Sequence, residues 1–206
     1  MENSENTNIT VERHPLPPFL PKQAKVLILG SFSPQKHRWS MEFFYPNRMN
    51  MMWEMMGWVM QNDANFFIDT ATNKFRQQAI VSYMEKAGIA IYDAAAAVKR
   101  LKNNASDLHL QVVEKTDIAG LLSVLPLCKH IACAGIKSAE LVCEDFKLKV
   151  PKLGENTMLN INGENICLWR MPSTSRACAM PMIKKAAYYK HLLVEAGVDV
   201  YDKKNM

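Results

Sequence analysis

Groups suited to binding a ligand follow three separate apolar segments of this chain. Residues 26–29, VLIL, are followed by Gly30 and Ser31 and then by a loop that is rich in basic and aromatic side chains. Asp93 directly follows a second apolar segment, and the turn at residues 172–176, PSTSR, follows a third. Aromatic rings can stack on a flat ligand, a carboxylate accepts hydrogen bonds, and small hydroxyls beside backbone N–H groups suit a phosphate. Loops that leave the carboxyl ends of central strands are where open α/β sheets bind ligands.

The elements that must position these groups are predicted from the apolar pattern. Short β-branched segments such as VLIL are typical of buried parallel strands, and the longer segments between them are typical of helices. Strands are predicted over residues 26–29, 89–92, 130–134 and 165–170. Helices are predicted from about residue 50 to residue 61 and over residues 74–87, 117–125, 138–146 and 182–196. Asn162 and Gly163 lie between two apolar runs, which predicts a hairpin and an antiparallel neighbour for the fourth strand.

The alternation of strands and helices predicts an α/β fold. It would be a three-layer α/β/α sandwich around a central four-stranded, mainly parallel sheet. The chain has 206 residues, no internal repeat and no linker rich in Gly or Ser, so residues 1–206 are expected to form a single domain. Residues 1–15 are expected to be a loosely ordered N-terminal arm, and Leu16 and Phe19 are expected to dock on the body.

Composition narrows the class of protein. A hydrophobic content of 49% with 22% charged residues is typical of a soluble globular protein, and a net charge of +5 permits a nucleic-acid partner without requiring one. The five Cys form no C-x-x-C pair and no signal peptide is evident, which predicts reduced thiols in a cytoplasmic protein. The Cys and His spacing predicts no metal site, and no apolar run reaches the ~20 residues that cross a bilayer. We expect a monomer that needs no cofactor.

Three segments together resemble a known family. Residues 30–32 form a Gly-Ser-Phe turn after a strand, followed by an aromatic pair, a Pro, and Asn50 and Trp53 in an Asn-x-x-Trp element. Residues 88–93, GIAIYD, have the form of a second core strand, and residues 169–175, WRMPSTS, run from a strand into a Pro-Ser turn. Over residues 25–193 the chain resembles the uracil-DNA glycosylase superfamily and is most similar to its hypoxanthine-DNA glycosylase branch.

The resemblance implies an activity. It implies a monofunctional DNA glycosylase of base-excision repair, which hydrolyses the N-glycosidic bond of a deaminated base (hypoxanthine, xanthine or uracil) in DNA. The partner would be DNA that contains such a base. No Lys is placed convincingly to form a Schiff base, which favours simple hydrolysis.

The first motif supplies the implied catalytic and base-binding residues. Tyr45 matches the aromatic residue that stacks on the base, and Gly30 and Phe32 line the same turn. Backbone N–H groups of this turn, Ser31 included, would stabilise the leaving base. Phe32 occupies the usual catalytic position of the superfamily, where it can neither hold a water nor accept a proton. Asn50 matches the residue implicated in the hypoxanthine branch, and it would orient a water; alternatively, it caps the helix that follows.

Asp93 predicts which base is read. Relatives that read uracil carry Asn at this position, whereas an ionised Asp only accepts hydrogen bonds and favours a base that presents N–H groups. This points to deaminated purines over uracil. Two alternatives remain: burial could keep Asp93 protonated, or Asp93 could cap a helix that begins at Ala94.

The remaining predicted contacts are with DNA. The resemblance implies that the turn at Pro172, Ser173, Thr174 and Ser175 grips the strand beside the everted nucleotide. Arg176 would fill the vacated stack or pair with a phosphate. Arg38 lies in a basic aromatic loop, residues 36–39, which suits a nucleic-acid backbone, and residues 184–185 (KK) could extend that surface.

Two other functions are compatible with the sequence. Phe32 and Met171 put apolar side chains at two standard catalytic positions, which favours a nucleic-acid-binding protein that keeps the fold without the activity. The modest net charge leaves a third reading, an enzyme that acts on free nucleosides.

Overall fold

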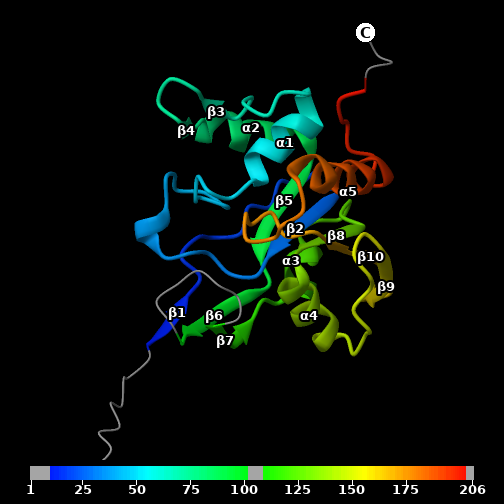
Figure 1. The fold of residues 1–206 in the computed structure, drawn as a ribbon. Coiled ribbons are helices and arrows are strands. Elements are labelled where there is room, and N and C mark those ends of the chain that lie inside the picture. The colour runs from blue at the N-terminus through cyan, green and yellow to red at the C-terminus, as the bar shows by residue number, and fades with distance from the viewer. Residues whose placement is uncertain (1–9, 102–108, 203–206) are drawn as a thin grey trace, which may run out of the picture.

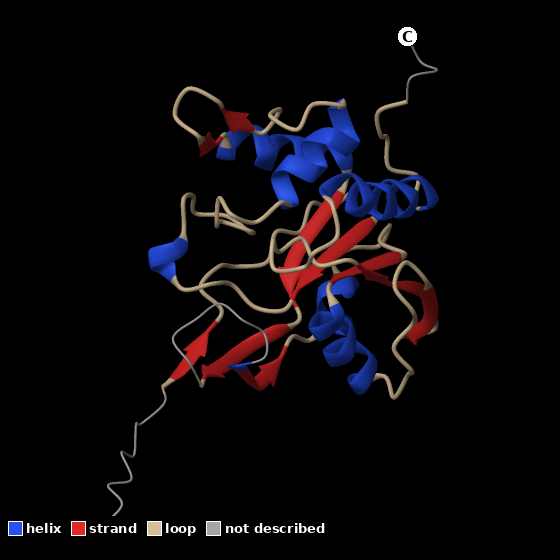
Figure 2. Cartoon of the chain, viewed as in Figure 1, coloured by secondary structure: helices blue, strands red, loops and turns tan. Residues whose placement is uncertain are grey.

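A sheet of five strands forms the centre of the protein, in the order β5-β2-β8-β10-β9 (Figures 1 and 2). The structure of the protein is a computed structural model, which describes residues 10–101 and 109–202. The strands are β2 (Val26–Gly30), β5 (Ile89–Asp93), β8 (His130–Ala134), β9 (Asn156–Ile161) and β10 (Glu164–Met171). The first three and β10 run parallel, and β9 is antiparallel to β10. All four predicted strands are therefore confirmed.

The sheet has five strands where four were predicted for the central sheet. The fifth is β9, which pairs with β10 along its whole length through the predicted hairpin. Asn162 and Gly163 have φ values of 53° and 85°, the left-handed conformation that a tight two-residue hairpin turn requires. The hairpin itself is thus confirmed, and its first strand extends the sheet.

Apolar side chains on both faces of β2 explain the three layers. Every residue of β2 is buried, and successive side chains point to opposite faces of the sheet. Val26 and Ile28 join one hydrophobic core with α1 (Met52–Gln61), α2 (Gln77–Ala87) and α5 (Met182–Glu195). Leu27 and Leu29 join a second core with α3 (Ile118–Ser123) and α4 (Ile136–Asp145). In Figure 1 the first set of helices lies above the sheet and the second set below it.

The helix ends follow local signals. Gly88 adopts φ 71° and its N–H bonds to the carbonyls of Glu85 and Met84, so α2 ends where the glycine predicts. Asp117 accepts a hydrogen bond from the N–H of Gly120 and caps α3. α2 begins three residues later than predicted, because β4 (Lys74–Phe75) pairs with β3 (Ile68–Asp69).

A second, antiparallel sheet was not predicted. It has the order β1-β6-β7, from β1 (Val11–Arg13), β6 (Ala95–Arg100) and β7 (Leu110–Lys115). The prediction of a helix after Asp93 is therefore wrong. The N–H groups of Ala94 and Ala95 donate to the carbonyls of Gly30 and Ser31 at 2.8 and 3.2 Å, and this tertiary pairing overrides the helix propensity of alanine. Figure 1 shows β5 leading directly into β6.

The N-terminal segment is better ordered than predicted over its described part. β1 pairs with β6, in the register Val11 opposite Lys99, so residues 11–13 are not a loose arm. Phe19 forms two backbone hydrogen bonds with Ile91, at 3.0 and 2.9 Å, which confirms that this region docks. Residues 1–9 and 102–108 lie outside the described residues. The second range includes residues 103–107, NNASD, whose residue types predict a turn. No helix within residues 10–101 and 109–202 is long and apolar enough to cross a membrane.

Candidate functional site

Gly30, Asp93 and Tyr45 converge at the carboxyl ends of β2 and β5. The parallel register places Gly30 beside Asp93. A Cβ on Gly30 would lie 2.3 Å from Asp93 Oδ1 and 3.3 Å from the Tyr45 hydroxyl oxygen. The carboxylate and the tyrosine therefore lie against the same face of Gly30, and any larger residue there would displace them.

Asp93 is a buried carboxyl group with two polar neighbours. Its side chain is only 7% exposed. Oδ2 lies 2.8 Å from His14 Nε2, and the Ser33 hydroxyl donates to Oδ2 over 3.4 Å. Burial, then the charge of Asp93, raises the pKa of the adjacent Tyr92 hydroxyl. Because the next residues form β6, Asp93 does not cap a helix, which removes that alternative.

His14 is the site residue that the sequence analysis missed. Its side chain is 2% exposed, and its ring centroid lies 4.6 Å from that of Tyr92 and 5.4 Å from that of Phe32. No motif spacing marks it. His14 falls within residues 1–15, which were expected to be loosely ordered, and the one available signal is that it lies two residues before Leu16, which was expected to dock on the body.

The loop after β2 holds its aromatic residues in different ways. Tyr45 is half-buried, has the unusual φ of 50°, and packs edge-on against Trp53 at 6.4 Å between ring centroids. Phe44 is 2% exposed and belongs to the core, as predicted. Phe32 packs against His14, and the Arg100 guanidinium lies 5.5 Å from the Phe32 ring centroid.

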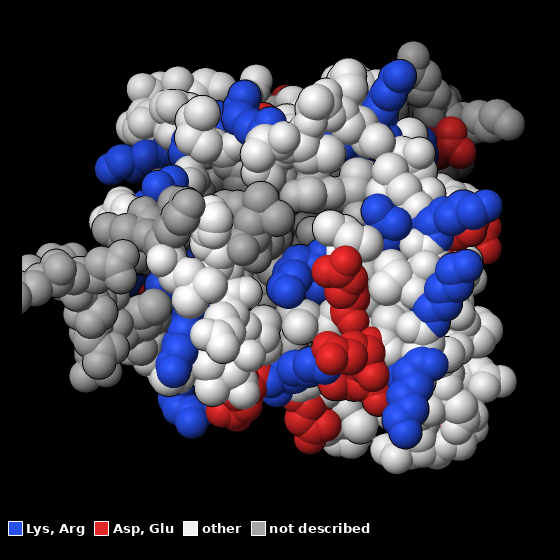
Figure 3. Space-filling view, turned by 60° about the horizontal axis from the view of Figure 1, so that its bottom comes forward, with Lys and Arg blue, Asp and Glu red and all other residues white. Residues whose placement is uncertain are grey.

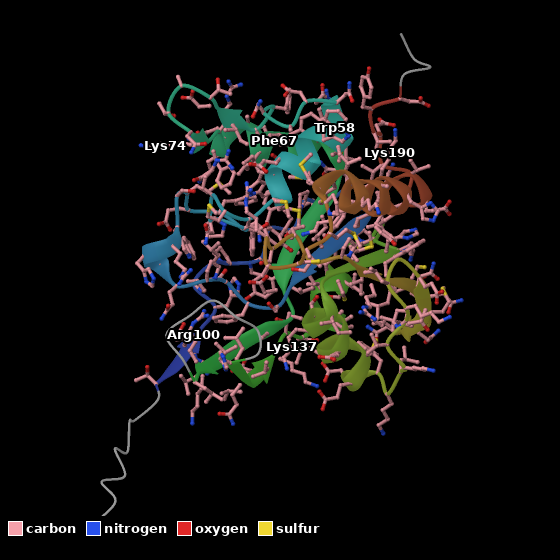
Figure 4. The ribbon with its side chains drawn as sticks, in the orientation of Figure 1. Trp58, Phe67, Lys74, Arg100, Lys137 and Lys190 are labelled. Atoms are coloured by element: carbon pink, nitrogen blue, oxygen red, sulfur yellow. The ribbon has the colours of Figure 1, made fainter. Side chains whose placement is uncertain are left out.

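Arg100 ties the second sheet to this loop. It is 8% exposed, and from β6 it donates to the Ser33 carbonyl and pairs with Glu12 at 2.8 Å (Figure 4 labels Arg100). β1 thus reaches the site through two contacts, Glu12 with Arg100 and, one residue past its end, His14 with Asp93.

Asn50 lies one residue before Met51, which is the N-cap of α1. The Asn50 Oδ1 accepts the N–H of Met52, the first residue of the helix, at 2.9 Å, so Asn50 stabilises the start of α1 without being its N-cap. An amide oxygen has two lone pairs, so this bond leaves room for Oδ1 to accept from a water as well.

The Pro-Ser turn is bonded to the start of α1. The Met51 N–H donates to the Thr174 carbonyl at 2.9 Å, which brings residues 172–176 next to Asn50. Arg176 Nε donates to the Met49 carbonyl at 3.0 Å, and its Nη2 lies 3.3 Å from Glu54. The Arg176 guanidinium is therefore held along α1.

Two serine hydroxyl groups accept hydrogen bonds from backbone N–H groups of the same segment. The Ser173 Oγ accepts the N–H of Ser175, and the Ser175 Oγ accepts the N–H of Ala177, both at 3.2 Å. Ser173 also lies beside Gly135, at the end of β8, where an added Cβ would meet the Ser173 Cβ at 3.5 Å. The turn is thus internally ordered and adjoins the ends of β8 and β10.

Lys185, on α5, holds this turn in place through hydrogen bonds. It is fully buried and donates to the carbonyls of Ser175 and Cys178 at 2.8 and 3.2 Å. Burial lowers the pKa of its ammonium group. The expectation that Lys185 extends a DNA-binding surface is therefore wrong. Tyr189 supports the same turn by donating to the Pro172 carbonyl at 3.1 Å.

Arg38 is not brought into this group by any described contact. It is exposed in η1 (Lys36–Arg38), which stands out at the left edge of Figure 1. Nearby, the Lys36 ammonium lies 4.2 Å from the Trp39 ring centroid and pairs with Glu42. On the face in Figure 3, acidic side chains are interspersed among the basic ones, and no single basic surface forms there.

Two hollows lie away from the converging residues. One, of about 430 Å³, is lined partly by Lys25 and Gly88, which directly precede β2 and β5, so it lies at the opposite end of the sheet. The other, of about 260 Å³, lies between α1 and the segment at residues 199–202. In the described part of the chain, no three His, Cys, Asp or Glu are grouped to hold a metal.

The structure is similar to the solution NMR structure of a candidate uracil DNA glycosylase from Methanosarcina acetivorans. The TM-score is 0.60, over 91% of this chain and 99% of that chain, at 17% identity. At this identity the similarity establishes the fold. No protein-family model and no curated protein matches the chain.

Proposed function

We propose that this protein is a DNA glycosylase that releases a deaminated base from DNA, with hypoxanthine as the preferred base. The observation that supports this most is the shared position of the Asp93 carboxylate and Tyr45 against Gly30, at the carboxyl end of a glycosylase-like sheet. An everted base needs a ring to stack on and a group that reads its edge, and these two residues supply both.

The geometry of Asp93 favours hypoxanthine on chemical grounds. His14 engages Oδ2, so Oδ1 is the oxygen on the side of Gly30 and Tyr45. Hypoxanthine presents N1–H with only a C–H on one flank, whereas the N3–H of uracil has a carbonyl on each side. A carboxylate next to two carbonyl oxygens is repelled, so the purine fits this acceptor better.

Bond cleavage would use the backbone of the first turn and one ordered water. N–H groups of the turn at Gly30, Ser31 and Phe32 would stabilise the negative charge on the leaving base, and one such donor is worth about 3 kcal/mol. Asn50 would orient the water through its second lone pair. Lys185 is buried and bonded to two carbonyls, which supports simple hydrolysis over a Schiff base.

DNA would be held by the ordered turn at residues 172–176. Pro172, Ser173, Thr174 and Ser175 would follow the phosphates beside the everted nucleotide, with Arg176 at the edge of the duplex. Arg38 would be a separate, peripheral backbone contact. We propose that the protein acts as a monomer.

The test is base release from oligonucleotides that contain hypoxanthine, xanthine or uracil. Wild-type protein should release hypoxanthine fastest, and Asp93→Asn should lower this rate and move the preference toward uracil. Asp63→Asn is the matched control, because Asp63 is exposed and its role as an acceptor for the Asn65 N–H is one that Asn can keep. An unchanged base preference in Asp93→Asn would overturn the assignment of Asp93.

The rival that keeps the fold without catalysis has its own support. Phe32 packs against His14, and Met171 is fully buried, so two standard catalytic positions carry apolar, packed side chains. Tight binding to abasic DNA without base release would establish this binding function instead. Cleavage of free inosine but not of DNA would point to a nucleosidase.

A further inference from the structure

A histidine from the N-terminal segment is the closest polar partner of the candidate base-reading carboxylate. We propose that His14 is a positioning residue, which fixes the proton and the orientation of the Asp93 carboxyl group and thereby the base preference. This inference rests on the proposed function. It rests equally on a contact between two residues 79 positions apart, one directly after β1 of the second sheet and one at the end of β5 in the central sheet.

The contacts of the His14 imidazole indicate which of its ring nitrogens carry a proton. Nδ1 lies 2.8 Å from the Leu16 carbonyl oxygen, and Nε2 lies 2.8 Å from Asp93 Oδ2. A carbonyl oxygen only accepts, so Nδ1 carries a proton. A second proton then lies between Nε2 and Oδ2, because two lone pairs would otherwise face each other. The other tautomer would accept the Leu16 N–H at Nδ1 over 3.3 Å, a longer contact.

The pair lies among apolar rings, with few other polar groups facing it. Phe32, Phe44 and Tyr92 surround the imidazole. The Ser33 hydroxyl lies 3.4 Å from both Nε2 and Oδ2, and the Tyr45 hydroxyl lies on the Oδ1 side.

Among the described residues, Arg100, Glu12 and Glu114 are linked to the pair through Ser33 and Tyr92. Arg100 bonds the Ser33 carbonyl and is itself paired with Glu12. Glu114 and Asp93 both raise the pKa of Tyr92, after burial. A buried carboxylate with no partner is costly, so His14 is what keeps Asp93 able to act as an acceptor.

The consequence is a defined hydrogen-bonding role for each carboxylate oxygen. The proton shared with His14 lies on the Oδ2 side, so Oδ1 stays an acceptor for an N–H of the base. Without the imidazole, the carboxyl group loses the partner that orients it. Loss of His14 is therefore expected to weaken hypoxanthine release.

The first experiment measures hypoxanthine and uracil release across neutral pH for His14→Ala and His14→Gln. His14→Ala should lose ~10- to 100-fold in hypoxanthine release, the worth of a hydrogen bond to a charged group. Gln can donate to Oδ2 without titrating, so His14→Gln should recover part of the rate. His191→Ala, an exposed histidine on α5, is the control.

A double-mutant cycle with Asp93→Asn separates positioning from general support of the fold. If His14 acts through Asp93, the double variant should be no worse than Asp93→Asn alone. Additive losses, or a rate in His14→Gln no higher than that in His14→Ala, would overturn the proposal.

A second readout does not need activity. In ¹⁵N-histidine NMR, the His14 resonances, identified by their loss in His14→Gln, should show both ring nitrogens protonated at neutral pH. Asp93→Asn should remove one of these protons. If no base is released but this signature is present, the glycosylase function fails and the pairing stands. If base is released and the signature is absent, the pairing fails alone.

Discussion

Gly30 is the residue whose missing side chain matters most for the candidate site. Its φ is not in the left-handed region, so its backbone would accept other residues. The constraint is close approach, because Asp93 Oδ1 occupies the space that a Cβ would need. Gly30 is therefore required at the end of β2 because the Asp93 side chain of the neighbouring strand β5 fills the space of a Cβ.

Gly30→Ala should therefore separate activity from stability. The added methyl must push Asp93 and Tyr45 away, and a displacement of this kind can cost about 100-fold in rate. Base release should fall by far more than the free energy of unfolding, which overpacking by one methyl lowers by about 1 to 3 kcal/mol. Gly163→Ala is the contrasting variant: its φ of 85° strains any side chain, yet nothing lies within 4 Å of the new Cβ. It should lower stability and leave base release unchanged.

At the scale of elements, α5 holds the turn that would contact DNA. Lys185 and Tyr189 lie one helical turn apart on α5 and bond three carbonyls of the segment at residues 172–178. The neighbouring Lys184 is exposed. Two adjacent lysines of one helix therefore have different roles, which their positions on its faces decide.

Lys185→Met should weaken DNA binding without changing its salt dependence. The buried methionine removes the anchor of the turn, so affinity should fall about 10-fold, comparable to losing one hydrogen bond to a charged group. Because Lys185 contacts no phosphate, the slope of log affinity against log salt should stay constant. Lys184→Met removes the same charge and keeps the anchor. A reduced salt slope in Lys185→Met would show that the lysine reaches the DNA.

For the molecule as a whole, burial of thiols limits stability at alkaline pH. Burial raises the pKa of Cys128 from 9.0 to about 11, and it also raises the pKa values of Cys133, Cys143 and Cys167. The native state keeps these protons while the unfolded chain loses them. The stabilisation is therefore complete below the unfolded pKa and is lost as pH rises toward the folded one.

Chemical denaturation across this range checks the sign. The free energy of unfolding of the wild type should fall between pH 9 and 11, with Cys128 responsible for about 2 kcal/mol at the upper end. Cys128→Ala should flatten this decline relative to its own value at neutral pH. Lys185, with its lowered pKa, contributes a slope of opposite sign, so the comparison between the two proteins is the informative quantity. Equal slopes for both would contradict the assignment.

The sequence by itself determined the elements whose signals are local. The buried strands β2, β5, β8 and β10, the glycine that ends α2 and the Asn-Gly hairpin each follow from a few neighbouring residues, because burial pattern and turn conformation are local properties. The order of these elements also indicated the layers of the fold.

Only the tertiary structure decided how distant segments meet. Ala95 to Arg100 form a strand because Ser31, β1 and β7 offer them hydrogen-bond partners. Lys185 is buried because the carbonyls of another segment replace its water, and His14 meets Asp93 across 79 residues. No local pattern records such pairings, since the free energy that selects them arises only when the chain has brought both partners out of water.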